Sequence, residues 1–414
     1  MPRSTSIFVF LLVLASRAQA GFLEQASDAL LFRDSENRFQ LQLSGLVDLE
    51  GYYTDQPPSG LIYTRNNFLF NPRLSIFADA QYTRHLYLFV QTRVDRGFDP
   101  SDESVQIRAD EYFLRYTPLD DSRISFQIGK FATVVGNWVA RHDSWTNPFI
   151  NAPLPYENLT GIWDSAAPDD VDVLLYWAHV PYEDATSFGD GYSDKESRLP
   201  IIWGPSYASG FAVSGTFDQF DYAAEIKNAS LSSRPEYWDI TERSFEYPTF
   251  SGRVGFRPNQ MWNFGVSASG GSYLNSEAAS TLPPGRSIGD YRELVLGQDI
   301  SFAWHHLQLW AEFYETRFEV PRIGNADTFA YYFEAKYKIT PQLFGALRWN
   351  QQLFGTVRDE ESRLQWGNDV WRIDAALGYR FTNYLQAKVQ YSLTEEDPQQ
   401  QGEHLVAVQL TLKF

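Results

Sequence analysis

The 414-residue chain has no cysteine, so no disulfide can hold it together and the fold alone must do so. Beyond residue 20, no apolar run reaches the roughly 18 residues that a membrane-spanning helix needs. The sequence also lacks the Gly-x-Ser-x-Gly, His-Glu-x-x-His, Walker and dinucleotide motifs. Its 34 Lys and Arg against 52 Asp and Glu give a net charge of -18, which argues against nucleic acid as a partner.

The first twenty residues predict a cleaved export signal. Arg3 supplies the positive start, Ile7 to Ala15 form a short apolar run, and Ala18-Gln19-Ala20 matches a small-residue cleavage site. The run is too short to span a bilayer, and a buried N-terminal helix is the alternative. We therefore expect cleavage after Ala20, followed by a short periplasmic segment at residues 21–38 of unassigned role.

Residues 39–414 alternate between apolar and polar side chains almost without pause. Clear examples are Phe39–Gly51, Trp371–Phe381 and the final stretch Val406–Phe414. A period of two predicts strands with one apolar and one polar face. Aromatic residues make up 16% of the chain, with 24 Tyr and 12 Trp, and a barrel whose lipid-facing side chains alternate with polar ones has this composition.

The connections between these strands alternate in length. Short turns are expected at residues 81–84, 118–122, 218–219, 258–260, 340–342 and 382–384. Long polar connections are expected at residues 54–66, 181–207, 229–248, 273–290, 321–327, 356–368 and 395–402. Soluble sandwiches do not sort their loops in this way. The pattern predicts an all-β fold, a transmembrane antiparallel β-barrel spanning residues 39–414.

Both ends of the barrel should lie on the short-turn side, so the number of strands should be even. About seventeen strands are clear, and the parity breaks between Phe131 and Val171. Leu159–Asp164 can supply the missing strand, which gives about eighteen, with sixteen as the fallback.

Aromatic residues on the apolar face gather near the short turns, as in the interfacial girdles of membrane barrels. The candidate girdle residues are Phe256, Trp262, Trp304, Phe381 and Phe414. The ending VAVQLTLKF, with its terminal aromatic, also resembles the assembly signal of Gram-negative outer-membrane proteins. That resemblance implies the outer membrane as location and the barrel-assembly machinery as a partner of the last strand.

The third long connection, residues 132–158, lacks clean alternation and is rich in proline and aromatic residues. A barrel this wide leaves an aqueous lumen unless something fills it, and such a loop is suited to that. Arg141, His142 and Asp143 would then place charge at the narrowest point. The candidate constriction residues are Trp138, Arg141, His142, Asp143, Trp145 and Glu157. A rigid surface loop with a solvated triplet is the alternative.

Charges of both signs lie on the polar strand faces, which predicts a transverse field across the lumen. The candidate lumen-wall residues are Arg73, Arg93, Arg115, Arg348, Arg372, Glu111 and Glu312. An arginine cluster would favour anions, whereas arginines paired with lumen carboxylates would only hold the barrel together. External acidic loops suggest divalent cations shared with lipopolysaccharide.

The placement of the third loop resembles that of trimeric porins over nearly the full expected mature chain. The run QIGKF, Gln127–Phe131, also resembles phosphate-selective porins of the O/P type. The resemblance implies a homotrimer that passes small hydrophilic solutes by diffusion, including anions such as phosphate, with no enzymatic activity and no cofactor. No phosphate ligand can be carried over position by position.

Two alternatives stay open. Trp310, Tyr314, Tyr332 and Phe344 fall on the polar face, where rings would stack on sugars in a sugar-specific porin. A secreted or outer-membrane β-rich carbohydrate-active enzyme would need two carboxylates about 5–10 Å apart in a cleft. His305-His306 is expected to form a short turn rather than a metal site.

Overall fold

The computed structural model describes residues 29–56, 60–62, 64, 66–96, 105–179, 198–359, 362–397 and 402–414. The expected signal peptide, residues 1–20, and most of the expected periplasmic segment lie outside these residues. The segment that begins at residue 39 forms the barrel described below.

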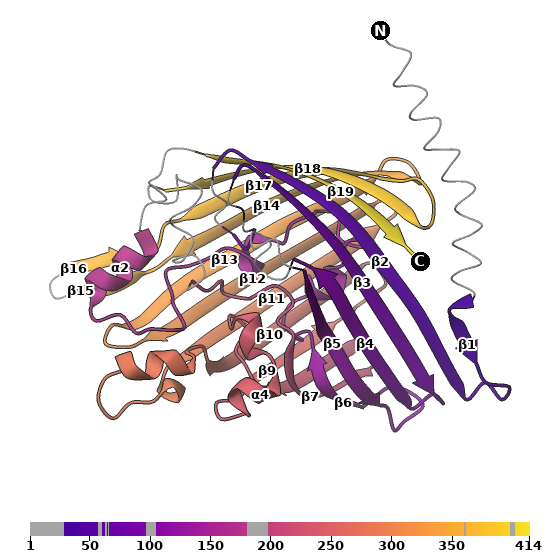
Figure 1. Ribbon diagram of the computed structural model, residues 1–414, viewed down its shortest axis with the longest axis horizontal. Coiled ribbons are helices and arrows are strands. Elements are labelled where there is room, and N and C mark those ends of the chain that lie inside the picture. Colours follow the sequence, from indigo (N-terminus) through magenta and orange to yellow (C-terminus); the bar gives the residue numbers. More distant parts are fainter. Residues whose placement is uncertain are drawn as a thin grey trace, which may run out of the picture.

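Within the described residues, sixteen antiparallel strands close into a barrel, with β19 paired to β2 (Figure 1). The wall strands are β2 (Phe39–Thr54), β3 (Phe68–Tyr82), β4 (Leu86–Asp95), β5 (Gln106–Tyr116), β6 (Ser125–Phe131), β7 (Ala208–Phe217), β8 (Phe220–Lys227), β9 (Thr249–Phe256), β10 (Trp262–Ser272), β11 (Arg292–Trp304), β12 (Leu307–Val320), β13 (Gly324–Lys338), β14 (Leu343–Phe354), β17 (Val370–Arg380), β18 (Leu385–Glu396) and β19 (Glu403–Lys413). Closure leaves no wall strand with an unpaired edge, which is the condition for crossing a bilayer with strands. The predicted all-β barrel is confirmed.

The estimate of about eighteen strands is wrong by two, and the fallback of sixteen is correct. Leu159–Asp164 does not join the wall, and the stretch from Val171, which the strand count included, forms helix α2 (Val171–His179). Thr160 and Ile162 exchange backbone hydrogen bonds with Leu199 inside the third long loop, and Trp163 bridges to Arg198. The backbone hydrogen bonds of this alternating stretch are made within the loop, so a period of two alone did not identify a wall strand.

The strands have one face in the lumen and one face outward. On β2, Leu46, Asp48 and Glu50 are buried in the interior, while Leu49 on the other face is exposed. On β12, Glu312 and Tyr314 are buried and Phe313 lies on the other face. Most charged wall residues therefore point into the barrel, and the outward face is largely apolar.

The connections separate by length as predicted, with two exceptions. The long connections predicted at residues 132–158 and 181–207 belong to a single connection between β6 and β7. Residues 218–219 and 305–306 make two-residue turns, with positive φ at Asp218 and His305. Residues 321–327 do not form a long loop, because β12 and β13 are joined by residues 321–323 alone. The long connection before β17 carries a small hairpin of β15 (Thr356–Asp359) and β16 (Ser362–Gln365).

The helices lie in the long connections. They are η2 (Val139–Arg141), η3 (Leu154–Tyr156), α2 (Val171–His179), η4 (Pro235–Tyr237), α4 (Ile240–Arg243), η5 (Ser276–Thr281) and η6 (Ile288–Asp290). In the described ranges, none of them has the length and apolar character needed to cross a membrane.

The seam between the first and last wall strands is completed by two further contacts. Phe414 exchanges backbone hydrogen bonds of 3.0 Å with Gly45, and its ring lies where a β-carbon at Gly45 would be. Beyond that point β1 (Leu31–Arg33) pairs with residues 40–42 of β2. The terminal aromatic ring thus covers a glycine on the neighbouring strand, as in aromatic rescue of strand glycines.

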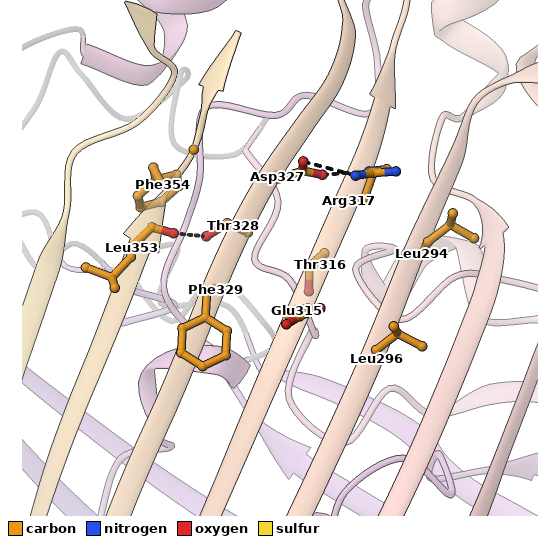
Figure 2. A pocket seen from close by; sticks show the side chains of 11 residues that line it. Leu294, Leu296, Glu315, Thr316, Arg317, Asp327, Thr328, Phe329, Leu353 and Phe354 are labelled. Atoms are coloured by element: carbon orange, nitrogen blue, oxygen red, sulfur yellow. Dashed lines mark hydrogen bonds and ion pairs between the residues drawn. The ribbon is translucent and has the colours of Figure 1, made fainter.

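A groove of about 570 Å³ crosses the outward face of β11 to β14 near the long-loop end (Figure 2). Leu294, Leu296 and Phe329 give it an apolar floor. Arg317 and Asp327 form an ion pair at 2.6 Å on its rim. The apolar band of the outer wall ends here.

Candidate functional site

The connection between β6 and β7, hereafter L3, is described at residues 132–179 and 198–207 and includes the predicted third loop, residues 132–158. That predicted part folds into the barrel after β6 ends at Phe131. It crosses the lumen to β12, where the Glu312 carboxylate accepts hydrogen bonds from the backbone N–H groups of Asn137 and Trp138, the latter at 2.9 Å. The Tyr156 hydroxyl donates to the same carboxylate at 2.7 Å. One wall carboxylate therefore holds two separate parts of L3.

Gly136 allows this close approach. Its φ is +76°, and a β-carbon there would lie 2.1 Å from the Tyr314 hydroxyl and 2.5 Å from that of Tyr156. Both the backbone conformation and the space favour glycine at the point where L3 meets the wall.

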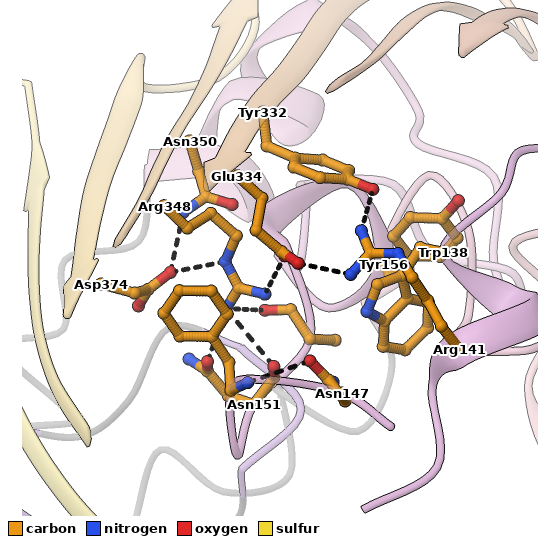
Figure 3. A network of polar contacts seen from close by, with 12 residues as sticks. Trp138, Arg141, Asn147, Asn151, Tyr156, Tyr332, Glu334, Arg348, Asn350 and Asp374 are labelled. Atoms are coloured by element: carbon orange, nitrogen blue, oxygen red, sulfur yellow. Dashed lines mark hydrogen bonds and ion pairs between the residues drawn. The ribbon is translucent and has the colours of Figure 1, made fainter. Parts of the chain in front are cut away.

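A buried chain of alternating charges ties L3 to β13, β14 and β17 (Figure 3). Arg141 of L3 pairs with Glu334, which lies 3.6 Å from Arg348, and Arg348 pairs with Asp374 at 2.8 Å. Asp374 also pairs with Arg372 at 3.1 Å. We call this set, completed by Glu157 of L3 against Arg372, the anchor network: Arg141, Glu334, Arg348, Asp374, Arg372 and Glu157.

L3 backbone groups complete the anchor network. Arg348 donates to the side-chain oxygen of Asn151 at 2.7 Å and to the carbonyl of Ala152 at 3.1 Å. Arg372 donates to the same Ala152 carbonyl at 2.5 Å. Arg348 is 0% exposed at its side chain, so these bonds replace the water it would otherwise need.

Lys388 on β18 holds the next stretch of L3. Its ammonium group donates to the carbonyls of Ser144, Asn147 and Phe149 at 2.8, 3.0 and 3.2 Å. Gln390, also on β18, accepts a hydrogen bond of 2.6 Å from the Ile150 N–H. L3 is thereby fixed along the wall from β12 to β18.

An apolar cluster fills the space between L3 and this wall. Trp138 and Tyr156 of L3 pack at a tilt of 37° with ring centres 4.5 Å apart, and Tyr156 meets Tyr314 edge-on at 5.9 Å. Tyr332 is also buried, and its hydroxyl accepts a hydrogen bond of 3.0 Å from Arg141. The lumen on this side is packed like a protein interior.

On the opposite side, L3 leaves a cavity of about 400 Å³ against β2 to β5 and β19. The L3 segment that faces it, residues 142–146, is hereafter the tip. Wall residues Asp48, Arg73, Arg93 and Glu111 line the cavity together with the tip. This is the place where charged groups of L3 and of the wall face one another across open space.

The wall arginines here are paired. Arg73 lies 3.1 Å from Asp48 and 2.6 Å from Glu50, and Arg93 lies 3.0 Å from Asp110. Their side chains are 21% and 17% exposed, so they keep contact with the cavity. Arg115 has no carboxylate partner in the described part of the chain and is held by Gln127 at 2.8 Å.

His142 at the tip is held as a neutral ring. One ring nitrogen lies 2.5 Å from the Val139 carbonyl. Because a carbonyl can only accept, this nitrogen carries the proton. The other ring nitrogen accepts a hydrogen bond of 2.6 Å from the Tyr207 hydroxyl. Burial lowers the pKa of His142 below its usual value of 6.5, and Arg93 and Arg73 lower it further. The Val139 carbonyl and Asp143 oppose this shift.

The six predicted constriction residues divide between the two sides. His142, Asp143 and Trp145 line the cavity. Trp138 is buried, and Arg141 and Glu157 point to the wall in the anchor network. Among the predicted wall residues, Arg73, Arg93 and Glu111 line the cavity, whereas Glu312, Arg348 and Arg372 lie beneath L3. Their effect on solute passage stays a prediction.

The predicted girdle residues all lie at the short-turn end. Phe256 ends β9, Trp262 begins β10 and Trp304 ends β11. Phe381 follows β17, and Phe414 follows β19. Trp304 is 56% and Phe381 40% exposed on the outer wall.

Sequence reasoning did not single out Glu334, Lys388 or Gln390 as site residues. Each falls on the lumen face of its strand, which the alternation does show. Their partners are backbone carbonyls, a backbone N–H group and a side chain of L3 more than 190 positions earlier, for which no sequence signal exists.

No protein-family model and no curated protein matches the sequence, but solved structures do. OmpF of Salmonella typhi, in a complex with daunomycin, is 13% identical over 92% of this chain and 100% of that chain, with a TM-score of 0.56. The anion-selective porin of Comamonas acidovorans is 9% identical over 91% and 100%, also at 0.56. The channel DcaP of Acinetobacter baumannii is 9% identical over 92% and 99%, at 0.53. The fold is that of outer-membrane porins.

At such low identities the likeness concerns the fold alone. The narrower resemblance to phosphate-selective O/P porins is not confirmed by these porin-fold neighbours and stays a prediction.

Proposed function

We propose that this protein is a porin of the outer membrane of a Gram-negative-type cell, exported with cleavage after Ala20. Small hydrophilic solutes would diffuse passively between the tip of L3 and the wall formed by β2 to β5. The observation that carries the proposal is the cavity lined by both, inside a closed barrel whose other side is filled. A filled half and an open half together give a narrow, charged passage.

The ion preference follows from which charges stay uncompensated. Arg73 and Arg93 have carboxylate partners, while no ion pair in the described residues joins Lys336, Arg380 or Lys413 to a carboxylate. These three cations face the lumen near the short-turn end. Glu111 and Asp143 at the cavity also form no ion pair within the described residues, and the preference for anions rests on the three cations outweighing these two carboxylates. Phosphate is one anion to be tested.

Lipopolysaccharide is the membrane partner that the outer-wall groove supports (Figure 2). Leu296 and Phe329 suit an acyl chain, while Glu315, Arg317 and Asp327 at the rim suit a phosphorylated headgroup joined through divalent cations. Chelation would then lower the thermal stability of the protein in lipopolysaccharide-containing membranes.

Two further partners are proposed from the sequence pattern. One is the barrel-assembly machinery, which would recognise the last strand with Phe414. The other is a second and third copy in a homotrimer, and cross-linking of the membrane-embedded protein followed by gel electrophoresis would count the copies.

The alternatives have less support. Of the four rings considered for a sugar channel, Tyr314 and Tyr332 are fully buried, Phe344 is 4% exposed, and Trp310 lies under Arg141 at 4.3 Å. They are not available to stack on a sugar. In the described ranges, no group of three or more His, Cys, Asp or Glu could hold a metal. That the protein has no enzymatic activity stays a prediction.

Planar-bilayer conductance of the purified protein under a salt gradient tests the proposal. We expect stepwise openings and a reversal potential on the anion-selective side. A protein that inserts as a heat-modifiable barrel and never conducts would contradict the porin function.

A further inference from the structure

The floor of the cavity is built by strand register. Lys413, Leu46, Ser75 and Arg93 form one row across β19, β2, β3 and β4. The next row toward the short turns holds Ser44, Phe77, Gln91 and Glu111, from β2 to β5. Adjacent strands lie about 4.8 Å apart, so Lys413 and Phe77 are within reach of one small molecule.

Aromatic rings give this part of the lumen an apolar surface. Phe77 and Phe89 stack with ring centres 6.2 Å apart and planes at 22°. Both line the cavity and are only partly buried, and Trp145 of the tip lines it from the other side. Arg380 lies over the Trp145 ring at 5.2 Å, and Phe89 also packs on Phe113, so Phe77 and the cavity side of Phe89 are the ring surfaces that a solute can contact.

One cation in the cavity is available to an anion. Arg73 and Arg93 are paired with carboxylates, as described above. Lys413 is exposed, forms no ion pair within the described residues, and its ammonium nitrogen lies 5.9 Å from the centre of the Trp145 ring. It therefore projects over the cavity toward the tip.

Two buried polar side chains lie between the cation and the rings. Ser75 is 3% and Gln91 5% exposed, and neither side chain forms a hydrogen bond in the described part of the protein. The hydroxyl and the amide can each donate to an oxygen of a bound molecule. Both residues line the cavity, so these groups are open to a solute or to water there.

The carboxylates limit the charge of that molecule. Asp48, Glu111 and Asp143 also line the cavity. A dianion such as hydrogen phosphate would meet all three, while a single negative charge beside Lys413 would meet far less repulsion.

We propose that this cavity is a binding site for a small aromatic carboxylate, with the ring on Phe77 and Phe89 and the carboxylate at Lys413. The cavity of about 400 Å³ accommodates one such ring, and it lies within the size range of small-molecule sites. This inference rests on the proposed function and names the solute class that the passage would favour.

The probe is benzoate, tested by calorimetric titration of the full-length purified protein in detergent and by block of the chloride current in bilayers. Acetate, benzyl alcohol, inorganic phosphate and glucose are the comparison solutes. Benzoate should bind more tightly than all four. The expected order follows because acetate and phosphate lack the ring, and benzyl alcohol and glucose lack the charge.

Three variants separate the two contacts. Lys413→Gln should weaken benzoate binding about tenfold and leave benzyl alcohol unchanged, because one charge-assisted contact is lost. Phe77→Leu should weaken benzoate about threefold and leave acetate unchanged. Lys413→Arg keeps the charge and should restore benzoate binding. The matched control is Lys338→Gln, an exposed lysine of β13 outside the cavity, with a change below about twofold.

Benzoate binding no tighter than that of acetate, phosphate or glucose would overturn the inference, as would equal losses in Lys413→Gln and Lys338→Gln. Retained heat-modifiable migration shows that each variant is folded. A protein that conducts chloride without benzoate block contradicts this inference alone. A protein that binds benzoate in the calorimeter and never conducts contradicts the proposed function alone.

Discussion

The two sides of the lumen use the same residue types in different ways. Beneath L3, Arg348 and Arg372 are 0% and 6% exposed at their side chains and hold loop and wall together. On the side of β2 to β5, Arg73 and Arg93 are also paired with carboxylates, yet they still line the cavity. A lumen arginine therefore contributes to stability or to passage depending on whether L3 covers it.

The largest effect is expected from breaking the anchor network. Arg348→Ala leaves the buried carboxylates of Glu334 and Asp374 without this cationic partner, which should lower the free energy of unfolding by about 3–5 kcal/mol. Urea unfolding in lipid vesicles measures the change. Arg257→Ala is the control, because Arg257 is 63% exposed and its pair with Asp221 should contribute about 1 kcal/mol or less.

The comparison of these two variants tests whether the anchor network stabilises the protein. Equal and small losses in Arg348→Ala and Arg257→Ala would mean that the anchor network does not hold L3. Larger and noisier single-channel currents in Arg348→Ala would show that the loop had loosened.

Glu312→Gln should have the next largest effect. The carboxylate accepts from two L3 backbone N–H groups and from Tyr156, and hydrogen bonds to a charged group are worth about 1.5–3 kcal/mol. The same urea titration measures it. Glu315→Gln on the exposed face of the same strand should change stability by less than about 0.5 kcal/mol, and a similar loss in both variants would contradict the role given to Glu312.

On the open side, the expected effect is on selectivity rather than stability. Asp143→Asn removes a negative charge from the tip, while the amide oxygen can still accept from the Trp145 and Thr146 N–H groups, which lie 2.8 and 2.9 Å from the carboxylate. The reversal potential in a salt gradient should move toward anion selectivity, and stability should change by less than about 1 kcal/mol. An unchanged reversal potential would place the solute path elsewhere.

The smallest effect is the pH dependence due to His142. Because its pKa in the folded protein lies below 6.5, the neutral ring stabilises the fold fully above pH 6.5, and this contribution is lost as pH falls through the lower folded-state value. His142→Gln should remove this component from stability curves measured between pH 7 and pH 5. Outside this component, the unfolding free energies of wild type and variant should change with pH in parallel. Identical pH dependence in the two proteins would show that His142 does not contribute to it.

The barrel could be predicted from sequence because a period of two is a local property of each strand. The alternation that places Glu312 and Tyr314 in the lumen is visible without any structure. The count of strands failed at Leu159–Asp164, because this alternating stretch forms its backbone hydrogen bonds with Leu199 within L3.

The division of the lumen could not be predicted in the same way. Arg73 and Arg348 look equivalent in sequence, each on the polar face of a strand. Their difference depends on the path of L3 across the barrel, which is fixed by contacts such as those of Glu312 with Asn137 and Lys388 with Ser144. These partners are far apart in the chain, so no spacing reveals them.

The most direct test of the divided lumen uses the absence of cysteine from the chain. Single-cysteine variants Ser44→Cys, at the cavity, and Ala346→Cys, beneath Phe149 on the packed side, would be exposed to a charged thiol reagent during bilayer recording. We expect the reagent to reduce the current through Ser44→Cys and to leave that of Ala346→Cys unchanged. Rapid block of Ala346→Cys with no effect on Ser44→Cys would show that solutes pass on the side of β12 to β18 and would contradict the divided lumen.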